Sequence, residues 1–240
     1  MGRPTFVWAH GLLSSVAHED QAGLFDWSGL DDVARVVRYD TRGHGTADAL
    51  YEERAYRWSA MVDDMLWAAG DGPFVAGGVG MGAAVAIYAA IRAPRRVQAL
   101  VLALPPPAWE TRTSAADAFR SAACEVEGAG ISGYERWLRA QVRPPVRVAV
   151  HHLRRMEHRV MAAILRGAAR SDLPSRNEVG GVVMPALILA CDGPERPVAT
   201  AEALTELLVL SELHVAHDLA GTGEWPTLVR DLLSELPQWE

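Results

Sequence analysis

Residues 74–92 read FVAGGVGMGAAVAIYAAIR, and this stretch decides more about the fold than any other. It opens with apolar residues typical of a buried strand and closes with a longer apolar run typical of a buried helix. Gly78, Gly80 and Gly82 stand between the two. Glycine tolerates positive φ angles and lets backbones approach closely, so the pattern predicts a strand and a helix joined by one tight turn.

The rest of the chain alternates in the same way. We expect further strands at 5–9, 33–39, 97–104, 182–190 and 212–216, and further helices at 57–69, 134–142, 148–166, 200–210 and 225–236. This alternation favours an α/β fold with a mostly parallel sheet flanked by helices. Strand signals disappear over residues 105–179, so we predict a helical cap there, inserted into a core made of residues 1–104 and 180–240.

The composition excludes several function classes. The 240 residues are 50% hydrophobic, which suits one compact unit with a buried core. The 23 basic and 30 acidic residues give a net charge of -7, which argues against binding to nucleic acid or to an anionic membrane. Every basic residue is arginine. The absence of lysine excludes Schiff-base, pyridoxal-phosphate and P-loop lysine chemistry, although coding bias alone accounts for it.

Location and partners follow from similar arguments. The 2 cysteines are too few for a disulfide framework, no apolar run approaches a bilayer span, and the first residues do not read as a secretory leader. We therefore expect a cytoplasmic protein with a small-molecule substrate and with neither nucleic acid nor membrane as a partner. A homodimer stays open. We expect no metal and no other cofactor.

The glycine-rich turn has the layout of a nucleophile elbow, written G-x-S-x-G, in which a serine stands at the sharpest point. Gly78 and Gly82 fit the outer positions, but the central residue is Gly80. Glycine has no side chain, so a covalent acyl-enzyme cannot form at this position. A glycine also avoids a backbone cost of about 1 kcal/mol that a serine would bear in this strained conformation.

With this turn and four other segments, the chain resembles the α/β-hydrolase fold superfamily, and within it the actinobacterial enol-lactonase-like hydrolases. The other segments are WAHGL at 8–12, RYDTRGHG at 38–45, RRVQALVL at 95–102 and PALILA at 185–190. The resemblance covers nearly the whole chain. It implies the α/β-hydrolase fold and says much less about the substrate.

In that family a serine attacks an acyl carbon, a histidine takes its proton and an aspartate orients the histidine. The resemblance places these roles on Gly80, His217 and Asp192. The spacing from Asp192 to the following proline motif is one residue longer than usual, so strict register would put Gly193 at the acid position. We keep Asp192 as the orienting acid, with Glu195 as a second choice and capping of a turn as the alternative role for Asp192. Because the acid and histidine motifs also depart from the family pattern, we interpret Gly80 as natural rather than engineered.

The resemblance also implies an oxyanion hole made by the backbone N–H groups of Leu12 and Met81. Backbone donors need no particular side chain, so this feature survives the loss of the serine. The helix that begins near Met81 points its positive end at the same place. An oxyanion, an enolate or a carboxylate should therefore still bind there.

Other residues have weaker claims to a role in the site. We assign substrate contacts to His10, Ser14, Trp109 and Trp137, with loop capping or packing as the alternative for each. Asp40, Arg42 and His44 match the family's structural turn after the second strand. A histidine group in the cap, His151, His152 and His158, raises a metal hypothesis because His151 and His158 would share a helical face. No carboxylate or cysteine completes a ligand set, so we interpret the group as a solvated basic face.

Three functions from different classes fit these residues. The first and favoured one is an enzyme in which His217, oriented by Asp192, activates water against a small ester, thioester or lactone bound in the oxyanion hole. The second is a lyase, isomerase or cyclase of a natural-product pathway, in which His217 moves a proton beside a bound enolate. The third is a non-catalytic binding protein.

Overall fold

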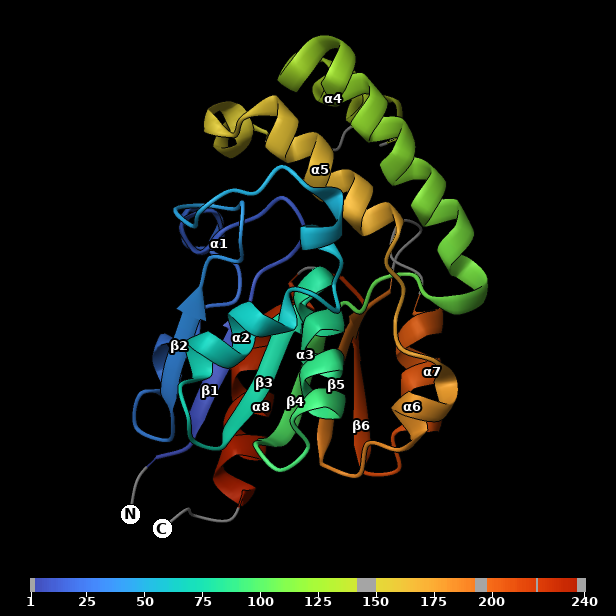
Figure 1. The fold of residues 1–240 in the computed structure, drawn as a ribbon. Coiled ribbons are helices and arrows are strands. Elements are labelled where there is room, and N and C mark those ends of the chain that lie inside the picture. The colour runs from blue at the N-terminus through green and yellow to red at the C-terminus, as the bar shows by residue number, and fades with distance from the viewer. Residues whose placement is uncertain (1–2, 142–149, 193–197, 219, 237–240) are drawn as a thin grey trace.

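The computed structural model describes residues 3–141, 150–192, 198–218 and 220–236, and these contain a sheet of six parallel strands (Figure 1). The strands are β1 (Thr5–Ala9), β2 (Arg35–Tyr39), β3 (Phe74–Val79), β4 (Val97–Ala103), β5 (Ala186–Cys191) and β6 (Ser211–Ala216), in the order β2-β1-β3-β4-β5-β6. Parallel strands bring all their carboxyl ends to one edge. The loops that follow β1, β3, β5 and β6 therefore leave the sheet on the same side, where binding sites of open α/β sheets lie.

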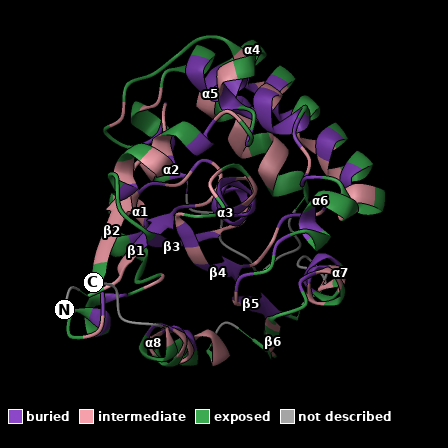
Figure 2. Ribbon diagram, turned by 60° about the horizontal axis from the view of Figure 1, so that its bottom comes forward, coloured by how far each residue is buried: buried purple, intermediate pink, exposed green. Residues whose placement is uncertain are grey.

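Helices cover both faces of the sheet. One face packs against α2 (Val62–Ala69), α3 (Met81–Arg92) and α7 (Ala199–Leu207), and the other face packs against α8 (Trp225–Glu235). Of the shorter helices, α1 (Val16–Ala22) lies above the carboxyl end of β2, and α6 (Arg176–Gly180) lies beside α7 (Figure 1). The central strands and α3 are almost wholly buried, as Figure 2 shows in purple. Burial on both faces explains why these strands read as continuous apolar runs.

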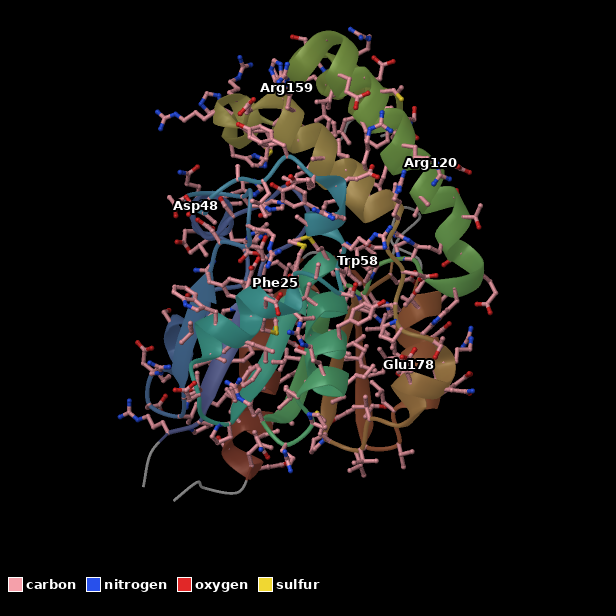
Figure 3. All side chains as sticks on the ribbon, in the orientation of Figure 1. Phe25, Asp48, Trp58, Arg120, Arg159 and Glu178 are labelled. Atoms are coloured by element: carbon pink, nitrogen blue, oxygen red, sulfur yellow. The ribbon has the colours of Figure 1, made fainter. Side chains whose placement is uncertain are left out.

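Two long helices, α4 (Arg112–Gln141) and α5 (His158–Ala169), pack against each other above the carboxyl edge of the sheet (Figure 1). α4 is kinked at Ala129 and Gly130, and a Cβ atom on Gly130 would lie 2.2 Å from His158 Cε1, so a side chain there would displace the His158 ring. The guanidinium of Arg112 lies 4.4 Å from the ring centre of Trp58, which Figure 3 labels below α5. This contact ties the start of α4 to the core.

The predicted fold class is confirmed: a parallel sheet flanked by helices, with a helical insertion between β4 and β5. The domain boundaries at 104 and 180 stay a prediction. In the part of the chain that the structure describes, no helix combines the length and the apolar character needed to cross a membrane.

Several element boundaries were predicted wrongly, for reasons that the packing makes clear. The strand expected from 182 begins only at Ala186, because Val182 and Met184 are buried in the core as part of a loop. The helix expected over 57–69 begins at Val62. The helix expected over 148–166 begins at His158, and its residues 148 and 149 lie outside the described part. The sequence pattern also missed the short helices α1 and α6.

Candidate active site

The strand, tight turn and helix predicted around Gly80 are present. β3 ends at Val79, Gly80 has φ 56° and ψ -110°, and α3 begins at Met81. The outer glycines are required by close packing: a Cβ atom on Gly78 would lie 2.4 Å from the carbonyl carbon of Gly82, and one on Gly82 would lie 2.1 Å from the carbonyl oxygen of Ala9. These contacts press the start of α3 against both β1 and β3.

At position 80 the backbone conformation favours glycine, whereas crowding by neighbouring atoms does not require it. The nearest heavy atom to a Cβ atom built on Gly80 is the carbonyl oxygen of Leu104, at 4.0 Å. A side chain at this position would therefore have space, although its backbone would be strained at positive φ. The elbow keeps its shape and presents an open position where a side chain could stand.

The two backbone donors expected at the oxyanion hole are available. Met81 is the first residue of α3, so its N–H has no acceptor within the helix. The N–H of Leu12 likewise has no acceptor among the described residues. The loops that carry them are neighbours, because Ala9 pairs with Gly78 in the sheet and a Cβ atom on Gly11 would lie 3.6 Å from Val79 Cγ1.

A buried histidine pair holds the Leu12 loop in place. The N–H of Thr41 donates to His10 Nε2 at 3.1 Å, so His10 carries its proton on Nδ1, which donates to the Gly11 carbonyl at 2.8 Å. The N–H of Leu13 donates to His44 Nε2 at 3.2 Å. Burial lowers the pKa of His10 and lowers that of His44 to about 3, so both rings are neutral. With both nitrogens engaged, His10 holds the loop and has no free ring nitrogen for a substrate.

The turn after β2 is also structural, as interpreted from the sequence. The Asp40 carboxylate accepts from the N–H groups of Val16 at 2.8 Å and Thr46 at 2.9 Å. Arg42 forms a two-point ion pair with Asp64, with its Nη2 2.6 Å from Asp64 Oδ1. These bonds fix the start of α1 and the loop beneath the cap.

His217 and Asp192 follow adjacent strands. β5 and β6 pair up to Cys191 and Ala216, and the N–H of Asp192 donates to the carbonyl of Ala216 at 2.8 Å. Both side chains are exposed, and within the described residues no hydrogen bond joins them. The structure therefore joins the two backbones, and the pairing of the two side chains stays a prediction. Glu195, the second choice for the acid, and Gly193, where strict register would fall, lie outside the described residues.

The three other proposed contact residues have partners within the protein. Ser14 Oγ lies 2.9 Å from His18 Nδ1. The indole N–H of Trp109 donates to the carbonyl of Pro174 at 2.9 Å, at the edge of the core. Trp137 stacks on Tyr134 with ring centres 5.7 Å apart and packs with α5 in the cap.

The predicted shared face of His151 and His158 is wrong. His151 belongs to a 3₁₀ turn that ends at Arg155, and the backbone is extended at Met156 and Glu157 before α5 begins at His158. Among the described residues, no group of three or more histidine, cysteine, aspartate or glutamate side chains is placed to hold a metal ion. His152 instead stacks on His18, with ring centres 3.5 Å apart.

A cavity of about 640 Å³ adjoins the elbow, and sequence reasoning did not find it. Gly11, Val79 and Leu104 line it, and so does Glu19 of α1. Glu19 is only 1% exposed. Burial raises the pKa of its carboxyl to about 7, although Arg38 opposes that shift. A glutamate in a short polar helix reads as solvent-exposed, so no signal in the sequence marked this residue.

Comparisons with known proteins agree with this architecture. A family model described as "alpha/beta hydrolase fold" matches residues 4–122. None of the curated proteins matches the chain. Among similar solved structures, MenH from S. aureus is 20% identical over 98% of this chain and 95% of its own, with a TM-score of 0.75.

Two further solved structures are similar to nearly the whole chain. The enol-lactonase from Burkholderia xenovorans LB400 is 18% identical over 98% of this chain and 93% of its own, with a TM-score of 0.67. The bottromycin epimerase BotH, solved with bottromycin A2, is 18% identical over 99% and 92%, with a TM-score of 0.71. Likeness at these identities establishes the fold alone. With the family match, it shows that the chain belongs to the α/β-hydrolase fold superfamily.

Proposed function

We propose that this chain is an enzyme that acts on a small ester, thioester or lactone by acid–base chemistry, without a covalent intermediate. The observation that carries the proposal is the elbow at Gly80. It combines a strained turn and two N–H groups that have no acceptor among the described residues with an open position in place of a side chain. Carbonyl activation is therefore supported, and nucleophilic attack by residue 80 is not.

In this mechanism the substrate carbonyl oxygen accepts hydrogen bonds from the N–H groups of Leu12 and Met81. A water molecule over Gly80 attacks the carbonyl carbon while His217 takes its proton. His217 then gives that proton to the departing alcohol or thiol, and the acid product leaves. Each well-placed oxyanion donor contributes roughly 10²–10³ in rate, so the preformed N–H pair is the largest single contribution.

His217 needs to be oriented for this role. Its ring is exposed and makes no hydrogen bond to a described residue, so it can turn toward a bound water. Asp192 is the orienting acid in the proposal, because its backbone is bonded to the residue that precedes His217. Without a fixed acid, the rate should depend strongly on how reactive the substrate is.

A second candidate is a proton transfer beside the carbonyl, as in an isomerase, lyase or cyclase of a natural-product pathway. Such a reaction needs an oxyanion hole and a base but no nucleophile, so the missing side chain at Gly80 does not impair it. The structural likeness to an epimerase solved with its bottromycin ligand favours this class. A non-catalytic binding protein is the third possibility. The small-molecule substrate, the cytoplasmic location and a homodimer stay predictions.

One experiment separates the three. A panel of activated esters, thioesters and lactones is incubated with the protein in D₂O, and the products are followed by mass spectrometry. Hydrolysis without deuterium at carbon supports the proposed hydrolase. Incorporation of deuterium at the carbon next to the carbonyl, without cleavage, would reject the hydrolase and support the proton-transfer enzyme. Saturable binding with neither change leaves a binding protein.

The matched variants are His217→Ala and His214→Ala. His214 lies in β6 and pairs with Glu212 at 2.7 Å, away from the proposed chemistry. We expect His217→Ala to lower kcat by roughly 10²-fold or more and His214→Ala to leave it unchanged. Equal activity of the two variants would remove His217 as the base.

A further inference from the structure

Two residues that line the cavity beside the elbow each carry a buried polar atom with no hydrogen-bond partner among the described residues. Glu19 Oε2 accepts from Arg38 Nη2 at 3.1 Å and from Trp8 Nε1 at 3.2 Å, but Glu19 Oε1 has no hydrogen bond. Trp27 Nε1 is likewise buried without a partner. Both residues line the cavity. Leaving a buried carboxylate oxygen unpaired costs free energy, so an acceptor and a donor here point to a ligand that supplies the missing bonds.

Aromatic rings form the walls around these atoms. Phe25, Trp27 and Trp225 line the cavity, and the ring centre of Phe25 lies 6.2 Å from that of Trp27 and 6.1 Å from that of Trp225. Phe25, labelled in Figure 3, has φ 53°, which a phenylalanine rarely adopts. The surrounding packing must hold this strained backbone, and strain of this kind clusters at ligand sites.

The charged side chains that line the cavity, among the described residues, are all acidic. They are Glu19 and Asp26. The nearest basic partner, Arg38, is already bound to Glu19 Oε2 and to Asp20. Aromatic faces attract cations through their ring quadrupoles, and a carboxylate adds a directional acceptor.

We propose that this cavity binds an organic ammonium group carried on an apolar body, with Glu19 Oε1 accepting a hydrogen bond from the ammonium and the rings of Phe25, Trp27 and Trp225 packing around its substituents. The indole N–H of Trp27 donates to an oxygen of the same ligand. A primary amine whose aromatic or aliphatic body also carries an oxygen atom has this chemistry.

The position of the cavity connects it to the elbow. Val79 directly precedes Gly80, and the carbonyl of Leu104 is the atom nearest to a Cβ atom on Gly80; both residues line the cavity. A ligand with its ammonium at Glu19 would extend its other end toward the oxyanion hole. The site therefore selects amine-bearing carbonyl compounds as substrates, and this part of the proposal rests on the proposed function. The binding of an amine in the cavity does not depend on that function.

The test is direct binding by isothermal titration calorimetry with 2-phenylethylamine and, as the uncharged match, 2-phenylethanol. The wild-type protein should bind the amine roughly tenfold or more tightly than the alcohol, since hydrogen bonds to charged groups are the stronger ones. Glu19→Gln keeps the shape of the side chain and should abolish this preference. Glu206→Gln, at an exposed position of α7, should retain it.

The dependence of binding on pH gives a second readout. The pKa of Glu19 is raised to about 7 by burial, with Arg38 and Trp8 opposing and Asp20 adding to the shift. An alkylammonium stays protonated to about pH 10. Binding of the amine should therefore tighten between pH 6 and 8 as Glu19 ionises, and this change should vanish in Glu19→Gln.

Several results would overturn the amine site. These are equal affinity for amine and alcohol, no amine binding by the stable wild-type protein, or an amine preference that survives Glu19→Gln. Amine binding by a protein that converts no carbonyl substrate would instead remove the proposed function and leave the amine site intact.

Discussion

The carbonyl oxygen of Leu104 is the nearest heavy atom to the position that a Cβ atom on Gly80 would occupy, and the two points are 4.0 Å apart. The end of β4 and the elbow after β3 thus enclose a space of ordinary contact distance, not a clash. This separates Gly80 from Gly78 and Gly82, whose missing side chains are required by neighbouring backbone. Crowding by neighbouring atoms therefore does not explain why residue 80 is a glycine.

This difference predicts losses of stability of different size for two alanine substitutions. Gly80→Ala should fold and lower the free energy of unfolding by about 1–3 kcal/mol, the cost of positive φ for an L-residue. Gly82→Ala places a Cβ atom 2.1 Å from the Ala9 carbonyl oxygen, so it should cost on the order of 4 kcal/mol or prevent folding. Urea denaturation of both variants checks this. Similar losses would show that the space over Gly80 is closed.

Glu19 should make the protein less stable as the pH rises. Its pKa is about 7 in the folded protein against an ordinary value of 4.5, so the folded state binds more protons between these values. Stability therefore falls as the pH rises through this window, by on the order of 3 kcal/mol. Urea denaturation at pH 5 and pH 8 should show that wild type loses more stability than Glu19→Gln. Glu206→Gln should lose as much stability as wild type. If Glu19→Gln also loses as much stability as wild type between these pH values, the Glu19 carboxylate is not buried at a cost.

His44 should be needed for both stability and the oxyanion loop. It bridges the Leu13 N–H and the Arg42 carbonyl, so His44→Ala removes two buried bonds and should cost about 2–4 kcal/mol at pH 7. His214→Ala, near the surface, should stay within about 0.5 kcal/mol. Thermal unfolding measures both. A His44→Ala protein as stable as wild type would mean that the loop is held by other contacts.

The same residue predicts acid sensitivity. The pKa of His44 is about 3 in the folded protein and near 6.5 in the unfolded chain, so the unfolded state binds the extra proton between these values. Stability should therefore fall as the pH drops below about 6.5. Denaturation midpoints measured from pH 7 to pH 4 test the sign, and His44→Ala should show a weaker dependence on pH.

The sheet was predictable because its signals are local. The buried strands β1, β3 and β4 consist of apolar runs bounded by turns, and the tight turn at Gly80 follows from glycine spacing alone. Where apolar residues pack without forming a strand, as at Val182 and Met184, the same reasoning placed the boundary too early. The extended backbone at Met156 and Glu157 that separates His151 from His158 has no comparable mark in the sequence.

The site was only partly predictable. Gly80, Leu12 and Met81 depend on backbone position, which the motif spacing fixes, and the structure places them on neighbouring loops. The environment of Glu19 depends on contacts with Trp8 and Arg38 from two different strands, 11 and 19 residues away along the chain. Burial of a charge is a property of the assembled fold, so the sequence pattern of one helix could not reveal it.

The Gly80→Ser variant is mixed with p-nitrophenyl acetate, and the reaction is followed by stopped-flow release of p-nitrophenol and by mass spectrometry of the protein. If the elbow is an acyl-transfer site without its nucleophile, the variant should give a burst of about one equivalent and carry an acetyl group at position 80. Wild type should carry no acetyl group there and show no burst. A variant that folds but gains neither burst nor adduct would show that the elbow at Gly80 is not an acyl-transfer site.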